Sequence, residues 1–182
     1  MATITSGLIT FEEFERLPDH TGKQELLEGE LIELPPPKKR HNKVGQRIFI
    51  GLYDLITRAP REKMNPALGD VYHEMGYRVT RNPDSWLIPE VSVTHPGQSG
   101  EDYYEGAPLL PIEVVSPSNA AEQIADKVKL YLANGAREVW AVYPKMHSVW
   151  VYREGTYTVV TGTLKTDMLP QLSLDLANIF AD

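Results

Sequence analysis

The chain has 182 residues, of which 42% are hydrophobic and 24% charged, with no cysteine and a net charge of −7 at pH 7. This length suits one domain with a full hydrophobic core, and the lack of cysteine excludes disulfides, thiolate metal sites and cysteine nucleophiles. No apolar run is long enough to cross a membrane and the N-terminus lacks the pattern of a signal peptide, so we expect a cytoplasmic protein.

The first elements predicted along the chain are a short helix and a strand pair. Thr10 and Glu13 have capping-box spacing, which predicts a helix over 11–17. Two segments, 24–28 and 30–34, are separated by a single glycine and indicate paired strands or one bent strand.

The next segment predicts an amphipathic helix from His41 to about Thr57. Its apolar side chains recur at helical spacing, at Val44, Ile48, Leu52 and Leu55. The helix also begins in the most basic part of an otherwise acidic chain, which suits phosphate binding, although a solvated helix face has the same pattern. The candidate nucleic-acid-binding residues here are Lys38, Lys39, Arg40, Lys43 and Arg47.

The second half predicts strands and one more helix. Residues 71–80 indicate a strand with a bulge or bend at Gly76. A helix is expected from Asn119, which has capping-box spacing with Glu122, to Asn134. Three further strands are predicted, at 138–143, 148–153 and 156–160, with the last two forming a C-terminal hairpin over about 148–160.

Predicted strands precede and follow this second helix. A strand, a helix and a strand in this order predict a parallel crossover. The expected fold class is therefore α/β, a sandwich with a mixed central sheet flanked by helices. We expect a single domain over 1–182, with its core at about 41–143.

Two short apolar runs each contain one carboxylate. Glu90 lies in the run 86–93 and Glu113 in the run 109–115, and both runs are typical of buried strands. An ionised carboxylate in such a place needs a cation or hydrogen-bond donors. Two carboxylates at similar depth in neighbouring strands favour a divalent metal, which points to metal-assisted hydrolysis.

The second helix offers a cation to this pair. Lys127 borders the apolar stripe formed by Ile124, Val128 and Tyr131, whereas Lys129 points the opposite way. Glu90, Glu113 and Lys127 could thus converge into a site for phosphodiester cleavage by Mg²⁺ or Mn²⁺. The alternative is a simple ion pair between Glu113 and Lys127, with Glu90 facing solvent at a sheet edge.

Several sequence blocks together resemble the Uma-type family of restriction endonucleases, within the PD-(D/E)xK nuclease superfamily. The blocks are Glu-Leu-Leu-Glu-Gly-Glu-Leu at 25–31, His41 after a proline run, Pro89-Glu90-Val91, Gly106-Ala107-Pro108, Ile112-Glu113-Val114-Val115-Ser116-Pro117-Ser118, and Lys127, Tyr131 and Gly135-Ala136-Arg137-Glu138-Val139-Trp140. The resemblance spans roughly residues 10 to 152.

The resemblance implies a restriction-endonuclease-like fold, metal-dependent phosphodiester hydrolysis and a homodimer. Glu90 takes the place of the motif's aspartate, and Glu113 is its acidic partner, so both are expected to bind the metal. Val115 stands where the superfamily has its lysine, and Lys127 replaces that lysine from the following helix. Positions matching the family pattern add Glu25 and His41 as candidate catalytic residues.

The leading hypothesis is a metal-dependent endonuclease acting on DNA through a metal-activated water. The alternative is a catalytically inactive nuclease-fold module that binds nucleic acid or a protein partner, which the Glu90 replacement and the acidic net charge favour. A glycosidase with paired acids and no metal ranks last, because no aromatic-lined cleft is indicated.

Overall fold

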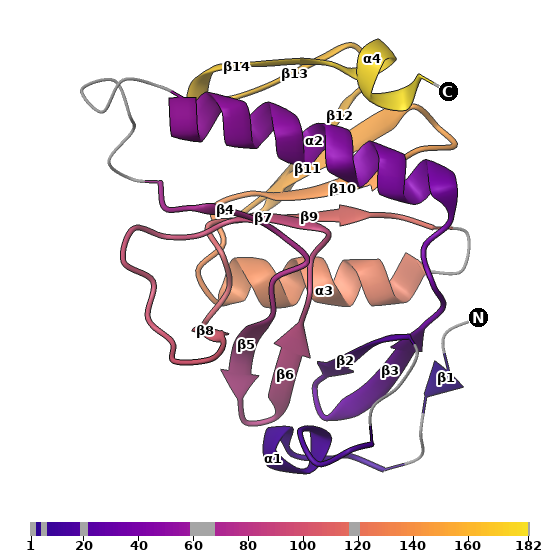
Figure 1. Ribbon diagram of the computed structural model, residues 1–182, viewed down its shortest axis with the longest axis vertical. Coiled ribbons are helices and arrows are strands. Elements are labelled where there is room, and N and C mark those ends of the chain that lie inside the picture. Colours follow the sequence, from indigo (N-terminus) through magenta and orange to yellow (C-terminus); the bar gives the residue numbers. More distant parts are fainter. Residues whose placement is uncertain (1–2, 5–6, 19–21, 59–67, 117–120, 182) are drawn as a thin grey trace.

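The computed structural model describes residues 3–4, 7–18, 22–58, 68–116 and 121–181. Within them the chain forms two six-stranded sheets, a separate two-stranded sheet and four helices (Figure 1). Both large sheets contain parallel and antiparallel pairs, so the predicted mixed α/β class is confirmed. The strands are divided among three sheets, however, rather than gathered in one central sheet.

The first sheet contains the predicted strand pair. Its strands in spatial order are β1 (Thr3–Ile4), β3 (Glu30–Leu34), β2 (Lys23–Leu27), β6 (Asp84–Leu87), β5 (Tyr77–Arg81) and β8 (Tyr104–Glu105). Strands β2 and β3 form a hairpin whose turn residues Glu28 and Gly29 both have positive φ, the backbone conformation of a tight two-residue turn. Helix α1 (Phe11–Phe14) begins with the predicted capping box of Thr10 and Glu13, but ends earlier than expected.

The second sheet contains Glu113, and Glu90 lies just before one of its strands. The run 86–93, predicted as one strand, is split: residues 86 and 87 belong to β6 of the first sheet and 91–93 to a strand of the second. Its strands in spatial order are β12 (Thr156–Val160), β11 (Ser148–Arg153), β10 (Val139–Tyr143), β9 (Leu110–Val114), β7 (Val91–Val93) and β4 (Val71–His73). Strands β9 and β10 are parallel, and helix α3 (Ala121–Ala133) forms the crossover between them, as predicted. The predicted capping residue Asn119 lies outside the described residues.

The predicted strand over 71–80 is in fact two strands in different sheets. Strand β4 pairs in the second sheet and β5 in the first, and the chain crosses between them at 74–76. Gly76 is needed at this crossing because a Cβ atom there would lie 2.7 Å from the ring of Trp86. The glycine therefore marks a change of sheet rather than a bulge.

Helices cover both faces of the second sheet (Figure 1). Helix α2 (Lys39–Arg58) lies on one face, where Val44, Ile48 and Leu52 are buried. Helix α3 lies on the other face and buries Ile124, Val128 and Tyr131. Side chains alternate along a strand, so Ile112 of β9 packs on the α2 side while its neighbour Glu113 faces α3.

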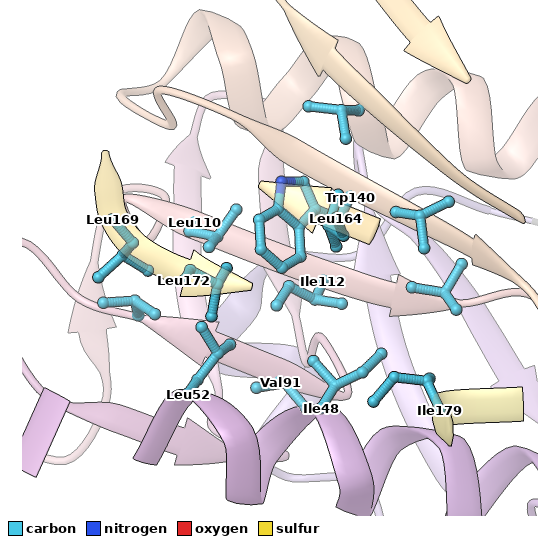
Figure 2. Packing of buried hydrophobic residues seen from close by; sticks show 14 of the residues in the cluster. Ile48, Leu52, Val91, Leu110, Ile112, Trp140, Leu164, Leu169, Leu172 and Ile179 are labelled. Atoms are coloured by element: carbon cyan, nitrogen blue, oxygen red, sulfur yellow. The ribbon is translucent and has the colours of Figure 1, made fainter. Parts of the chain in front are cut away.

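The C-terminal segment completes the core on the α2 side. Strands β13 (Thr163–Thr166) and β14 (Leu169–Asp175) form a hairpin, and helix α4 (Leu176–Phe180) follows it. Leu164, Leu172 and Ile179 pack with Trp140 and Leu52 (Figure 2), so the buried core extends well beyond residue 143. These three elements were not predicted from the sequence. None of the described helices combines the length and apolar character needed to cross a membrane.

Candidate functional site

Three buried carboxylates converge where the two sheets meet. Glu90 directly precedes β7, Glu113 lies in β9 and Glu25 lies in β2. Val91 pairs with Ile112 in the antiparallel ladder, so extending the register by one residue sets Glu90 opposite Glu113. Side chains directly opposite on antiparallel strands share a face. The two acids from the apolar runs therefore lie together, and a third joins them from the other sheet.

Lys127 of α3 bridges two of these carboxylates. Its Nζ lies 2.6 Å from Glu25 Oε2 and 3.3 Å from each carboxylate oxygen of Glu113. Only 4% of the Lys127 side chain is exposed, whereas Lys129, two residues further along the helix, is 79% exposed. The helical spacing thus assigned the two lysines to the correct faces. The expected ion pair exists, but it is part of a larger network.

Glu90 has its own set of partners. Its Oε1 lies 3.0 Å from His41 Nε2 and 3.5 Å from Lys23 Nζ, and its Oε2 accepts a hydrogen bond of 2.8 Å from the Val114 amide. The side chain is only 12% exposed, so the alternative in which Glu90 faces solvent at a sheet edge is wrong. The Val114 amide ties Glu90 to the residue that follows Glu113.

Neutral donors fix the other two carboxylates. The Tyr131 hydroxyl donates to Glu113 Oε1 at 2.9 Å, and the Ile88 amide donates to Glu25 Oε1 at 3.0 Å. Tyr131 lies one helical turn after Lys127, so both side chains leave α3 on the same side. Each carboxylate is therefore held by at least two groups, which fixes its orientation.

The network shifts the pKa values of its members in different directions. Burial raises the pKa of Glu113 to about 7, although the Lys127 ammonium opposes this. Burial also acts to raise the pKa of Glu90, but the positive charge of Lys23 and the hydrogen bond from His41 outweigh it and hold that pKa well below its usual value. Burial would lower the pKa of Lys127, yet Glu113 and Glu25 raise it, so this lysine stays charged.

An open cavity of about 630 Å³ gives access to the network. Glu90, Glu113 and Lys127 line its wall together with Lys23 and His41. Its exposed lining residues form a rim that contains Pro35, Pro36 and Pro37, the basic Lys38, Arg40 and Lys145, and the acidic Glu74. The cavity therefore joins the buried charges to an entrance where basic side chains outnumber acidic ones.

The candidate nucleic-acid-binding residues do not all lie at this entrance. Lys38 and Arg40 line the cavity, and Lys39 is exposed at the start of α2. Lys43 is half-buried one turn later. Arg47 is directed elsewhere, because its guanidinium donates to the carbonyls of Ile179, at 3.0 Å, and Ala181, which holds the C-terminal helix against α2.

Sequence reasoning missed Lys23. It lies two residues before Glu25 in β2, so strand alternation puts both side chains on one face. Strand alternation could therefore have placed Lys23 on the same face as Glu25, but nothing in the sequence showed which surface this face of β2 would pack against.

The donor set fits a hard divalent cation. Mg²⁺ and Mn²⁺ prefer oxygen ligands, and Mg²⁺ commonly takes one or two carboxylates and completes its shell with water and phosphate oxygens. Glu90 and Glu113 supply two carboxylates beside one cavity, although no three His, Asp or Glu side chains of the described residues form a ready-made metal cluster. His41 Nδ1 is also buried without a partner in the described chain, which leaves one polar atom at the site for a ligand or water.

Comparisons with known proteins concern the family and the fold of the chain. A family model described as "Uma2: Putative restriction endonuclease" matches residues 11–178. A crystal structure described as a putative nuclease belonging to DUF820, from Anabaena variabilis, is similar with a TM-score of 0.78 and 19% sequence identity, over 95% of this chain and 98% of that one. At this identity the likeness concerns the fold alone. No protein with curated annotation matches the sequence.

Proposed function

The chain belongs to the Uma2 family of putative restriction endonucleases, and we propose that it is a metal-dependent endonuclease that hydrolyses phosphodiester bonds of DNA. The observation that carries the proposal is the convergence of Glu90, Glu113 and Lys127 on one open cavity with a basic rim. Two oxygen ligands and a fixed ammonium suit metal-assisted phosphodiester hydrolysis.

Each side chain has a defined part in this proposal. Glu90 and Glu113 would hold the metal ion, which would act as a Lewis acid and activate a water. Lys127, held by Glu25, neutralises negative charge that develops on the phosphate or orients the attacking water. Tyr131 keeps the Glu113 carboxylate in place by its hydrogen bond.

Groups at the rim would position the substrate. Lys38 and Arg40 line the entrance and can bind backbone phosphates on either side of the scissile bond. Lys39 and Lys43 extend this positive surface along the start of α2. His41 holds Glu90 by a contact of 3.0 Å, so it ties the base of this helix to the carboxylate cluster.

A cleavage assay tests the proposal. Supercoiled plasmid and single-stranded DNA are incubated with Mg²⁺, Mn²⁺ or EDTA and with four proteins: wild type, Glu113→Gln, Lys127→Met and the control Lys129→Met. We expect nicking with either metal by wild type and Lys129→Met, and a loss of about 10²-fold or more in the other two. Undiminished cleavage by Lys127→Met would refute the assigned site.

A second function is supported by the pairing of every carboxylate with a protein cation. Glu25 and Glu113 contact Lys127, and Glu90 contacts Lys23, so each of these carboxylates has an ammonium partner without a metal. An inactive nuclease-fold module would retain such a network for binding alone. It predicts salt-dependent retention of DNA with no cutting under any metal condition.

The homodimer implied by the family resemblance belongs to the same proposal. Size-exclusion chromatography with light scattering over a range of protein concentrations measures it, and a constant monomer mass would remove this part of the proposal without affecting the site.

A further inference from the structure

The two lysines at the site occupy different depths. Lys127 contacts Glu25 at 2.6 Å, and both side chains are almost fully buried. Lys23 contacts Glu90 at 3.5 Å, and its side chain is 15% exposed on the cavity wall. Lys127 is therefore fixed between two carboxylates, whereas Lys23 has a longer contact to one carboxylate and lies beside solvent.

Lys23 reaches Glu90 from outside the sheet that carries Glu90. It lies in β2 of the first sheet, and its long, flexible stem crosses the junction to the carboxylate that precedes β7. Burial would lower its pKa, but Glu90, Glu25 and Glu113 raise it, so the side chain remains an ammonium ion. The cluster thus contains a second positive charge beside the carboxylate that would bind a metal.

A divalent ion and this ammonium compete for the same carboxylate. A metal ion and an ammonium group on the same carboxylate would repel each other strongly in a partly buried site. A metal bound to Glu90 therefore favours a conformation in which the Lys23 side chain has moved into the cavity. The energy needed to move the ammonium is subtracted from the binding energy of the metal.

We propose that Lys23 is a resident counter-cation of Glu90 that a metal ion must displace, and that this residue sets the metal affinity of the site. This inference rests on the proposed function, because it takes Glu90 as a metal ligand. Displacement also frees an ammonium group at the cavity wall, where a phosphate of the substrate can accept its hydrogen bonds. The metal would then bind most tightly when substrate is present.

Isothermal titration with Mn²⁺ in the absence of DNA tests the inference without relying on activity. The proteins are wild type, Lys23→Met, Lys23→Arg and the control Lys145→Met, which removes a positive charge from the exposed rim of the same cavity. We expect Lys23→Met to bind Mn²⁺ about tenfold more tightly than wild type, a difference of about 1.4 kcal/mol. Lys23→Arg should bind like wild type, and Lys145→Met should change the Kd by less than about threefold.

Thermal unfolding provides a second readout. In EDTA, Lys23→Met should unfold at a lower temperature than wild type because Glu90 loses a counter-charge, and Mn²⁺ should raise its Tm more than that of wild type. Lys23→Gln provides a second neutral variant should Lys23→Met fold poorly. A merely structural lysine would lower the Tm without this recovery by metal.

Three results would overturn the inference: Mn²⁺ binding by Lys23→Met that is equal to or weaker than that of wild type, an equal gain in Lys145→Met, or no Mn²⁺ binding by any of the proteins. Plasmid nicking separates this failure from that of the proposed function. A wild-type protein that nicks DNA while Lys23→Met gains no affinity overturns the role of Lys23 alone. Tighter metal binding without any nicking supports that role and removes the enzymatic proposal.

Discussion

Replacing Lys127 by methionine is expected to destabilise the protein in a strongly pH-dependent way. Methionine has a similar length and keeps the apolar stem, so the change removes mainly the charge. Lys127 Nζ contacts Glu25, whose side chain is 0% exposed, and both oxygens of Glu113. Breaking a buried ion pair by removing one partner costs about 3–5 kcal/mol. We expect a loss of that size near neutral and alkaline pH.

The loss should shrink as the pH falls. Burial already raises the pKa of Glu113 to about 7 with Lys127 present, and removing the ammonium raises it further. A carboxyl group whose pKa is higher in the folded protein than in the unfolded chain favours folding at low pH, and this contribution disappears as the pH rises through the folded value. At about pH 5 the variant can fold with Glu113 protonated, which removes one uncompensated charge.

Urea unfolding of wild type, Lys127→Met and Lys129→Met at about pH 5 and about pH 8 measures this. The double variant Lys127→Met/Glu113→Gln should recover part of the loss at the higher pH, because it removes the charge left unpaired. Equal destabilisation at both pH values, or a larger loss at the lower one, would refute the reasoning. So would a Lys129→Met protein as unstable as Lys127→Met.

Three further predictions follow from single contacts. Tyr131→Phe removes the hydroxyl that donates to Glu113, so the free energy of unfolding should fall by about 1 kcal/mol. The acidic limb of the pH–rate profile for cleavage should also move to higher pH, and an unmoved limb would contradict this. Mn²⁺ affinity measured by titration should increase as the pH rises through about 7, because Glu113 must lose its proton to bind metal; a pH-independent affinity would argue against Glu113 as a ligand. Arg47→Ala should speed amide hydrogen exchange in α4 while DNA affinity stays the same, because this guanidinium binds the carbonyls of Ile179 and Ala181. Weaker DNA binding by this variant would show that Arg47 contacts nucleic acid after all.

The positions of the central charges could be predicted because each depends on a short-range rule. Glu90 and Glu113 stood out as single carboxylates within apolar runs, and the helical repeat separated Lys127 from Lys129. These rules need only the local chain and the knowledge that one face is buried. Glu25 and His41 came from the family resemblance, since their own segments gave no sign of which partner they would meet.

The remaining features depend on contacts that are distant in sequence. Lys23 and Glu90 are 67 positions apart and come from different sheets, so strand alternation alone could not bring them together. The bulge or bend predicted at Gly76 is a change of sheet, which the local sequence could not show because the Trp86 ring that lies against Gly76 belongs to another strand. The hairpin of β13 and β14 has an uneven burial pattern in β14, which gives little periodic signal.

The ion network also joins the two sheets, which bears on why it is retained. Strand β2 of the first sheet sends Lys23 to Glu90 and Glu25 to Lys127, and both of those partners belong to the second sheet or to its crossover helix. Well-packed apolar side chains of similar size would often hold such a junction equally well or better, because burying charges carries a large desolvation cost. Most of the junction is already apolar, with Tyr77, Leu87 and Val139 fully buried. The charges are concentrated where this junction opens to a cavity, which supports the proposed chemistry on a bound ligand more than a role in stability.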